Sequence, residues 1–250
     1  MLIDAISYQL PEALISDEHR TLNDKDKLII LTPTSGEIID SNFSSLPLFL
    51  NQGDLLIFNN SPFPATNKSH QQSEADLNNT SQVEPTARKH FSKELLQHLT
   101  EKGVKFCDIT LHVGSESSEL MSNSIDQKIF HQEQVYISSN TITEIKLAKA
   151  AGKRVIAVGT TPARAIESWA NSGDIDKKQD FSQMVSLLIY PGYQWKMIDG
   201  LITHLHLPHS TLLLMVASLA NRAHLLSAYQ HAIKKHYLFG NYGDTMFIIG

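Results

Sequence analysis

Short apolar runs alternate with amphipathic segments along the chain, and this alternation predicts strands and helices in turn. Continuous apolar runs indicate buried strands, whereas helical spacing between capping residues and glycines indicates helices. The expected strands are 27–31, 37–39, 53–59, 104–113, 154–158, 185–190, 201–207 and 245–249. The expected helices are 92–102, 141–152, 161–170, 211–220 and 222–235. Strands that alternate with helices indicate an α/β protein in which helices flank a mixed sheet.

Capping residues mark where several of these helices begin. Ser92 is expected to cap the first helix, and Thr141 with Glu144 has the spacing of a capping box. Thr161 is expected to cap a further helix, with Pro162 at its first helical position.

One segment breaks the alternation. Residues 67–82 are polar and almost free of aliphatic side chains, which predicts a long flexible loop. This loop is the one expected boundary between parts of the chain. The sequence contains no internal repeat.

Composition narrows the class of protein. The chain has 250 residues and 42% hydrophobic content, enough for a proper core. The single cysteine, Cys107, excludes a disulfide framework within the chain and is expected to be a buried, inert thiol. The N-terminus lacks the pattern of a signal peptide, and the longest apolar run, 211–220, is too short to span a bilayer. We therefore expect a cytoplasmic protein that does not contact a membrane.

The formal net charge of −5 argues against nucleic-acid binding through the overall charge of the protein. Local basic patches remain possible at 88–90 and 234–236, although solvated faces are the simpler interpretation of both.

A strand-to-helix junction at Gly159, Thr160 and Thr161 is the first candidate site. The free N–H groups of the first helical turn and the helix dipole favour an anion such as a carboxylate or phosphate. Arg164 and Glu167 lie three residues apart on the same helix, near this end. The structural alternative is a well-capped helix with a surface ion pair.

A second candidate lies on the strand 104–113. Asp108, Thr110 and His112 alternate and therefore share one face. A histidine at a strand end can transfer protons near neutral pH. The alternative is a polar strand face turned to solvent.

Three histidines, His204, His206 and His209, lie in and just after the strand 201–207. Paired histidines are metal ligands in many proteins, but no HExxH or CxxC spacing supports such a site here. Hydrogen-bonded or active-site histidines are the favoured interpretation, and no metal is predicted.

Two turns complete the candidates. Tyr190 and Tyr193 flank a Pro-Gly turn and could stack against a nucleobase, or they could be ordinary rim aromatics. Gly243 could expose Asp244 as a base or hydroxyl ligand, although a turn-forming aspartate is the commoner explanation.

At these residues the chain resembles the S-adenosylmethionine:tRNA ribosyltransferase-isomerases of queuosine synthesis. The resemblance is carried by collinear motifs at 8–11, 53–59, 85–87, 90–91, 110–114, 131 with 133, 155–161 with 164, 167 and 168, 189–193, 199, 206–208, 210–213 and 242–244. Several collinear motifs are far more specific than any one of them alone.

The resemblance implies an unusual transferase and isomerase. The family moves and rearranges the ribosyl unit of S-adenosylmethionine onto 7-aminomethyl-7-deazaguanine at the tRNA wobble position, releasing adenine and methionine. It needs S-adenosylmethionine as a substrate and no prosthetic group or metal, but it does need a base that removes a proton next to the sulfonium. The candidates for proton transfer are His112, His206 and Asp244. The candidates for substrate binding are His90, Thr110, Gly159, Thr160, Thr161, Arg164, Tyr190, Tyr193 and Asp199.

The chain also departs from the family pattern. Family members carry a second, β-rich domain, which the segment 67–84 replaces with a polar loop, between core segments 1–66 and 85–250. Arginines of the family pattern are replaced by Pro62, Thr66 and His209, and an asparagine is replaced by His204. Proline, threonine and histidine do not supply the planar fork with which arginine binds phosphate or carboxylate.

Three hypotheses follow. The first is a compact ribosyltransferase-isomerase acting on tRNA or a related acceptor. The second is a catalytically degraded paralog that binds S-adenosylmethionine, a nucleotide or a partner protein. The third, and weakest, is a metal-dependent enzyme that uses the histidine cluster.

Overall fold

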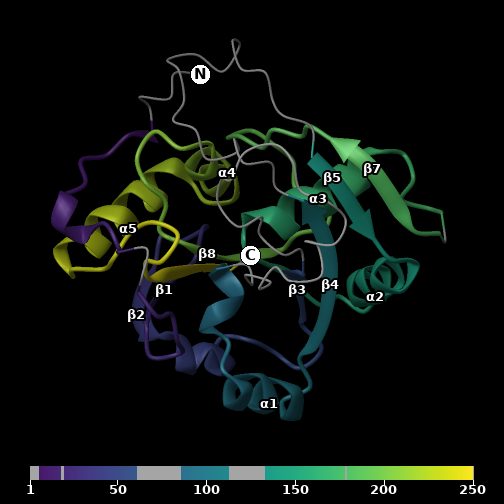
Figure 1. The fold of residues 1–250 in the computed structure, drawn as a ribbon, viewed down its shortest axis with the longest axis horizontal. Helices are drawn as coiled ribbons and strands as arrows, with labels where there is room; N and C mark the ends of the chain where they lie inside the picture. Colours follow the sequence, from purple (N-terminus) through teal and green to yellow (C-terminus); the bar gives the residue numbers. More distant parts are fainter. Residues whose placement is uncertain (1–5, 18–19, 61–85, 113–132, 178, 250) are drawn as a thin grey trace, which may run out of the picture.

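The strands form one mixed sheet with helices on both faces (Figure 1). The computed structural model describes residues 6–17, 20–60, 86–112, 133–177 and 179–249. The strands are β1 Lys27–Leu31, β2 Ile38–Asn42, β3 Leu55–Asn59, β4 Lys105–His112, β5 Glu133–Ile137, β6 Val155–Val158, β7 Phe181–Val185, β8 Gly200–His204 and β9 Thr245–Ile249. Their order across the sheet is β2-β1-β9-β8-β6-β3-β4-β5-β7.

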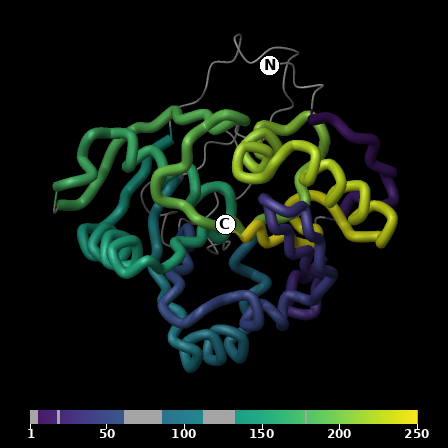
Figure 2. Tube along the Cα trace, turned by 180° about the vertical axis from the view of Figure 1, so that it is seen from behind, coloured from purple at the N-terminus to yellow at the C-terminus, as the bar shows by residue number. Residues whose placement is uncertain are grey.

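The helices are α1 Lys93–Glu101, α2 Ser139–Ala150, α3 Thr160–Asn171, α4 Thr211–Leu219 and α5 Arg222–Lys234. Short 3-10 helices lie at η2 Glu12–Leu14, η3 Phe43–Leu48 and η5 Thr86–His90. Seen from behind, α4 and α5 form a pair on the side opposite α2, and α1 lies apart from both (Figure 2).

The direction of the strands brings many chain segments to one edge of the sheet. β4, β3, β6 and β8 are parallel neighbours, so their carboxyl ends meet. β9 runs antiparallel to β8 and β1 runs parallel to β9, so both begin where β8 ends. β5 is antiparallel to β4 and likewise begins there. We call this the carboxyl edge, and such edges are where α/β proteins place ligands.

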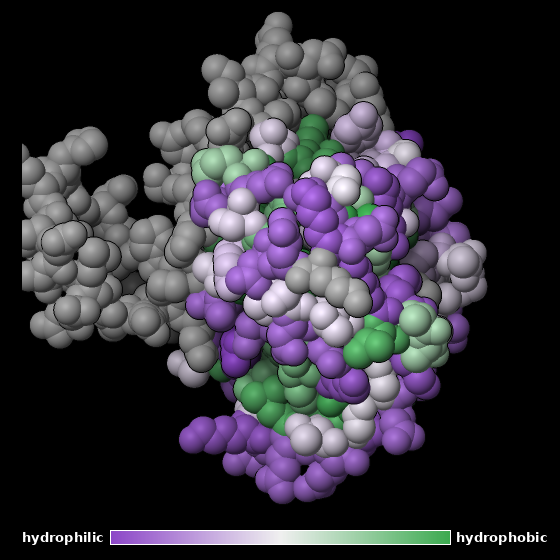
Figure 3. All heavy atoms as spheres, turned by 90° about the vertical axis from the view of Figure 1, so that its right-hand side faces the viewer, coloured by the Kyte–Doolittle hydropathy of each residue, from purple (hydrophilic) through white to green (hydrophobic). Residues whose placement is uncertain are grey.

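Two hydrophobic layers cover the two faces of the sheet. In β3, Leu55 and Ile57 pack into the larger layer with α2 to α5, whereas Leu56 and Phe58 pack into the smaller layer with η3, η5 and α1. A strand buried on both faces has no polar alternation, which explains why its sequence is a continuous apolar run. The outer face seen in Figure 3 is mainly hydrophilic, with apolar side chains in small separate groups.

The sequence prediction of an α/β fold with a mixed sheet is confirmed, and most elements lie where the pattern placed them. The strand predicted at 185–190 is wrong, because the strand is β7 and ends at Val185. Ile189 is buried outside any strand, so burial rather than strand pairing explains its apolar character. β5 was not predicted, and β8 ends at His204 rather than at residue 207.

Capping was predicted correctly at one helix and wrongly at two. Ser92 caps α1 by accepting from Leu95 N–H at 3.1 Å. α2 is capped by Ser138, whose Oγ accepts from the N–H of Thr141 at 3.1 Å, so Thr141 lies inside the helix. α3 begins at Thr160 with Gly159 as its N-cap, so Thr161 and Pro162 are its second and third residues.

The predicted polar loop 67–82 and the segment 67–84 lie outside the described residues, so the division into core and replaced domain stays a prediction. No described helix is by itself long and apolar enough to cross a membrane. α4 and α5 reach that length and composition only as a pair bent by 118°.

Candidate active site

The start of α3 meets the carboxyl edge directly. Gly159 follows β6 and donates its N–H to the carbonyl of Ile202 in β8 at 2.7 Å. Its φ of 98° and ψ of 158° lie in a region that only glycine adopts easily, and this conformation turns the chain from strand into helix. The Gly159 junction singled out from the sequence therefore lies at the carboxyl edge.

Two amide groups at this helix start have no partner among the described residues. The first N–H groups of a helix have no acceptor within the helix. Gly159 donates its own to β8, Pro162 has none, and no side chain caps α3. The N–H groups of Thr160 and Thr161 are therefore available, at the positive end of the helix dipole, for an anionic or hydroxyl group of a ligand.

A buried ion pair lies beside the same helix end. The guanidinium of Arg164 in α3 contacts one carboxylate oxygen of Glu133, at the start of β5, and Glu133 is only 4% exposed. The other oxygen, Oε1, is buried and has no hydrogen-bond partner among the residues that the structure describes. Burial lowers the pKa of Arg164 to about 10, which leaves it charged at neutral pH.

This pairing corrects the sequence-based alternative of a surface ion pair between Arg164 and Glu167. Glu167 is fully buried on α3 and accepts the backbone N–H groups of Lys196, Met197 and Ile198. The two side chains therefore serve different contacts.

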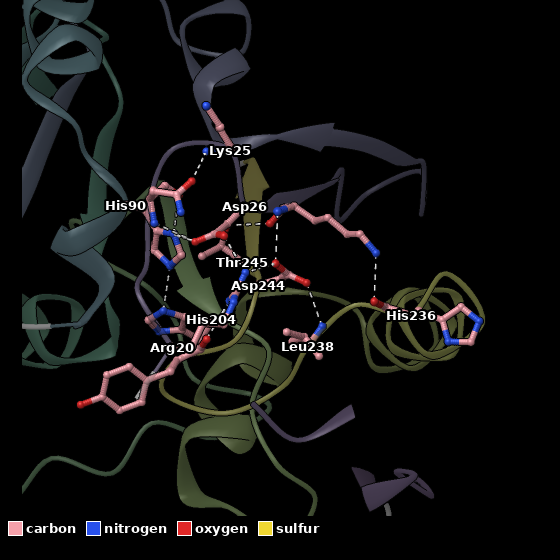
Figure 4. Close-up of polar contacts among 12 residues, drawn as sticks. Arg20, Lys25, Asp26, His90, His204, His236, Leu238, Asp244 and Thr245 are labelled. Atoms are coloured by element: carbon pink, nitrogen blue, oxygen red, sulfur yellow. Dashed lines mark hydrogen bonds and ion pairs between the residues drawn. The ribbon is translucent and has the colours of Figure 1, made fainter. Parts of the chain in front are cut away.

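A cluster of buried polar residues occupies the neighbouring part of the carboxyl edge (Figure 4). We call it the Arg20 cluster, and its members are Arg20, Asp26, His90, His204 and Asp244. The Arg20 guanidinium bonds to Asp26 at 2.5 Å and to Asp244 at 3.2 Å. The cluster thus joins the segment before β1, η5, the end of β8 and the segment before β9.

His90 lies at the centre of the cluster. Its Nδ1 is 3.0 Å from Asp26 Oδ2 and 3.2 Å from the carbonyl of Asn23, and its Nε2 is 3.0 Å from His204 Nε2. Its ring stacks on Phe43 with centroids 5.0 Å apart. The side chain is 0% exposed and both of its nitrogens are engaged within the protein, while the substrate contact expected from the sequence stays a prediction.

His206 and Asp244 are also enclosed. His206 Nε2 lies 2.8 Å from Thr203 Oγ1, and burial lowers the His206 pKa to about 4, so the ring is neutral at pH 7. Asp244 accepts from the backbone N–H groups of Leu238 at 2.8 Å and Lys27 at 3.1 Å, besides Arg20. These contacts hold both residues at the edge, and the proton-transfer roles expected from the sequence stay predictions.

β4 contributes Thr110 and His112. Thr110 donates its hydroxyl to Asn60 Oδ1 at 2.7 Å, just past the end of β3. His112 ends β4 opposite Gln134, at the carboxyl edge. Asp108, on the same strand, pairs with Arg88 at 2.9 Å.

Tyr193 and Asp199 lie away from this edge. Tyr193 donates to Glu167 at 2.8 Å, two turns along α3 from its start. Asp199 accepts from the N–H of Val155, the first residue of β6, so it lies at the opposite edge of the sheet. These contacts favour a structural role for both over the substrate binding expected from the sequence, while Tyr190 opens the turn and is 44% exposed.

Sequence reasoning did not single out Arg20 or Asp26, and it named Glu133 only as part of a motif. Nothing local distinguishes Arg20 and Asp26 from the surface charges around them in the sequence. His204 and His206 form hydrogen bonds to different partners, His90 and Thr203 respectively. In the described residues, no group of three or more His, Cys, Asp or Glu is arranged to hold a metal ion.

Comparison with known proteins identifies the family. A model of the family described as "Queuosine biosynthesis protein" matches residues 3–80 and 75–248. The chain belongs to this family. The resemblance drawn from the sequence motifs is thereby confirmed.

Similar queuosine biosynthesis proteins include two named S-adenosylmethionine:tRNA ribosyltransferase-isomerase. That of Synechococcus elongatus is 46% identical over 166 residues, which are 66% of this chain and 45% of the relative. That of Trichormus variabilis is 44% identical over 166 residues, 66% of this chain and 40% of the relative. The matched part of the chain thus spans less than half the length of either relative.

The fold is also similar to a crystal structure of S-adenosylmethionine tRNA ribosyltransferase from Thermotoga maritima. The TM-score is 0.77 at 25% sequence identity, covering 98% of this chain and 100% of that chain.

Proposed function

We propose that this queuosine biosynthesis protein transfers and isomerises the ribosyl unit of S-adenosylmethionine onto 7-aminomethyl-7-deazaguanine in tRNA, or onto a related acceptor. The observation that carries the proposal is the similarity of fold over 98% of the chain to the Thermotoga maritima ribosyltransferase. S-adenosylmethionine enters as a substrate, and its sulfonium supplies the activation that a prosthetic group would otherwise provide.

The start of α3 supports a place for S-adenosylmethionine. The N–H groups of Thr160 and Thr161 suit the methionine carboxylate, and the positive helix end stabilises its charge. Arg164 also lies near this end of the helix, where its charge is balanced by Glu133. Glu133 Oε1, which lacks a partner among the described residues, suits a ribose hydroxyl as donor.

Other candidates at the carboxyl edge complete the proposal. His112, at the end of β4, is a candidate for proton transfer, and Thr110 lies two residues before it on the same strand. Tyr190 is a candidate stacking surface for a base because its side chain is exposed.

The acceptor is the less constrained part of the proposal. The net charge of −5 and the replaced arginines lower the affinity of this chain alone for tRNA. A partner protein that carries part of the tRNA surface would compensate. An enzyme that acts on tRNA is expected in the cytoplasm, which agrees with the localisation expected from the sequence.

Adenine release tests the proposal. The purified protein is incubated with S-adenosylmethionine and tRNA that carries 7-aminomethyl-7-deazaguanine, and free adenine and the modified nucleoside are measured. Both products are expected. Binding of S-adenosylmethionine without adenine release would instead support the degraded paralog, and adenine release without modified tRNA would point to another acceptor.

A matched pair of variants locates the activity. Thr161→Pro removes one of the two N–H groups from the first turn of α3, where proline is tolerated, and it should weaken S-adenosylmethionine binding. Thr161→Val removes only the hydroxyl and keeps that N–H group, so it is the matched control and should bind as the wild type does. Equal binding by both variants would move the ligand away from these amides.

A further inference from the structure

Asp26, His90 and His204 form a continuous hydrogen-bonded chain at the carboxyl edge (Figure 4). The Asp26 Oδ2 to His90 Nδ1 distance and the His90 Nε2 to His204 Nε2 distance are both 3.0 Å. Asp26 and His204 are 7% and 5% exposed, so water competes little with these contacts. This is the order of groups, carboxylate to imidazole to reacting group, that activates nucleophiles in hydrolases.

The contacts fix where the protons lie. His90 Nδ1 faces two acceptors, the Asp26 carboxylate and the Asn23 carbonyl, so Nδ1 must carry a proton. The Nε2 atoms of His90 and His204 need one proton between them to form a hydrogen bond. Two protons therefore satisfy every contact, and two is the number that a pair of neutral imidazoles carries.

This count leaves His204 Nδ1 without a proton. No hydrogen bond joins that atom to any residue in the described ranges, so its lone pair is free to accept. Burial, and then the neighbouring His90, lower the pKa of His204 well below its usual range, which keeps the ring unprotonated at neutral pH.

His204 and the start of α3 lie at the same edge of the sheet. Val158 ends β6 and pairs with Ile202 of β8, whose carbonyl accepts the N–H of Gly159, and β8 continues two residues further to His204. The end of the hydrogen-bonded chain and the amides proposed to hold S-adenosylmethionine are thus both at the carboxyl edge.

We propose that His204 is a general base for the proposed reaction, with His90 and Asp26 as positioning residues behind it. The inference rests on the proposed function. His204 Nδ1 takes the proton from the carbon next to the sulfonium, and the electron pair of that C–H bond stays on the carbon as an ylide. The proton shared by the two Nε2 atoms moves to His90, which then carries the positive charge beside Asp26.

The surrounding charges favour this shift. Asp26 and Asp244 are two buried carboxylates, Arg20 is the cation that bridges them, and His206 is the neutral ring nearby. One cation among two buried carboxylates leaves a net negative environment, which stabilises an imidazolium at His90. The resemblance places an asparagine at position 204, and an asparagine amide can donate to His90 but cannot take up a proton. The base is therefore a property of this chain rather than of the family pattern.

His204→Asn is the informative variant because its amide keeps a hydrogen-bond donor for His90 Nε2 while the titratable ring is removed. We expect kcat for adenine release to fall about 100-fold, with little change in KM for S-adenosylmethionine. The wild-type rate should fall when the pH becomes low enough to protonate His204, and this acid limb should be lost in His204→Asn. His209→Asn, outside the cluster at φ 62° where asparagine is tolerated, is the matched control and should keep wild-type kinetics.

Nitrogen-15 NMR of the wild-type protein at pH 7.5 gives an independent readout. His204 Nδ1 should be unprotonated and His90 Nδ1 protonated. A protonated His204 Nδ1, or an active wild type whose kcat and pH profile are unchanged in His204→Asn, would overturn this inference alone. A wild type that releases no adenine would overturn the proposed function and this inference together.

Discussion

Tyr193 donates its hydroxyl to the carboxylate of Glu167 across 2.8 Å, and the same carboxylate closes the loop that leads into β8. It accepts the backbone N–H groups of Lys196 at 3.0 Å, Met197 at 2.9 Å and Ile198 at 3.0 Å. In the sequence Glu167 has the pattern of a charged surface residue. In the structure it is buried, and its hydrogen bonds connect α3 to the loop before β8.

Removing the hydrogen bonds of Glu167 should lower the free energy of unfolding. Glu167→Ala leaves three amides and a hydroxyl without their acceptor, which should cost about 3–5 kcal/mol of unfolding free energy. Tyr193→Phe removes one of these bonds and should cost about 1 kcal/mol. Urea denaturation measures both, and equal losses in the two variants would contradict the central place of Glu167.

Arg20 should stabilise the folded protein as well as hold the Arg20 cluster together. Arg20→Ala leaves Asp26 and Asp244 buried without their bridging cation, for an expected loss of about 3 kcal/mol. Arg20→Lys keeps the charge but cannot bridge two carboxylates with a planar fork, so its loss should be intermediate. Thermal unfolding compares the variants, and an Arg20→Ala protein as stable as wild type would show that the bridge contributes nothing.

Stability should fall in mild acid because of His206. The folded-state pKa is about 4, whereas an unfolded histidine has a pKa of about 6.5, so between these values only the unfolded chain binds the proton. The contribution is complete above about pH 6.5 and decreases as the pH falls toward 4. At pH 5 this amounts to a loss of about 2 kcal/mol, and His204, whose pKa is also lowered, adds to it in the same direction.

Unfolding free energies at pH 7 and pH 5 measure this dependence. Asp26 does not contribute to it in this pH window. Burial alone would raise the pKa of Asp26, but hydrogen bonds from His90 and Asn23 and the charge of Arg20 outweigh burial and lower it. An aspartate with a lowered pKa loses its contribution only below about pH 4, so the chosen window reports on the histidines. His206→Asn should flatten the dependence, and an unchanged slope in that variant would refute the assignment.

Gly159 should resist substitution more than another glycine with positive φ. Its φ of 98° and ψ of 158° suit only glycine, so Gly159→Ala should cost about 1–3 kcal/mol and displace the first turn of α3. S-adenosylmethionine binding should weaken about tenfold, the equivalent of one charge-assisted hydrogen bond.

Gly152→Asn is the control for that variant. Gly152 has φ 65° with nothing within 4 Å of an added Cβ, and asparagine tolerates this conformation, so both stability and binding should be kept. Calorimetry measures the affinity for S-adenosylmethionine. An affinity of Gly159→Ala equal to that of the wild type would show that the start of α3 does not bind this ligand.

The buried strands could be predicted well because burial on both faces produces a continuous apolar run, as in β3 and β6. β5 was missed because EQVYI is short and half polar, and β7 was misplaced because apolar residues after Val185 pack into the core without pairing. Local pattern records which residues are buried, but it does not record which backbone groups they pair with.

The candidate site divides in the same way. The Gly159 junction is local, so its position at the carboxyl edge followed from the order of strand, glycine and helix. The Arg20 cluster joins residues 20, 26, 90, 204 and 244, and no local signal connects them. Asp199 and Tyr193 match family motifs, yet their contacts with Val155 and Glu167 hold the fold.

A crystal structure with S-adenosylmethionine bound tests the central claim most directly. We expect the methionine carboxylate within hydrogen-bond distance of the amides of Thr160 and Thr161, and the carbon next to the sulfonium facing His204. S-adenosylmethionine bound beside Tyr193 and Asp199, away from the carboxyl edge, would contradict it.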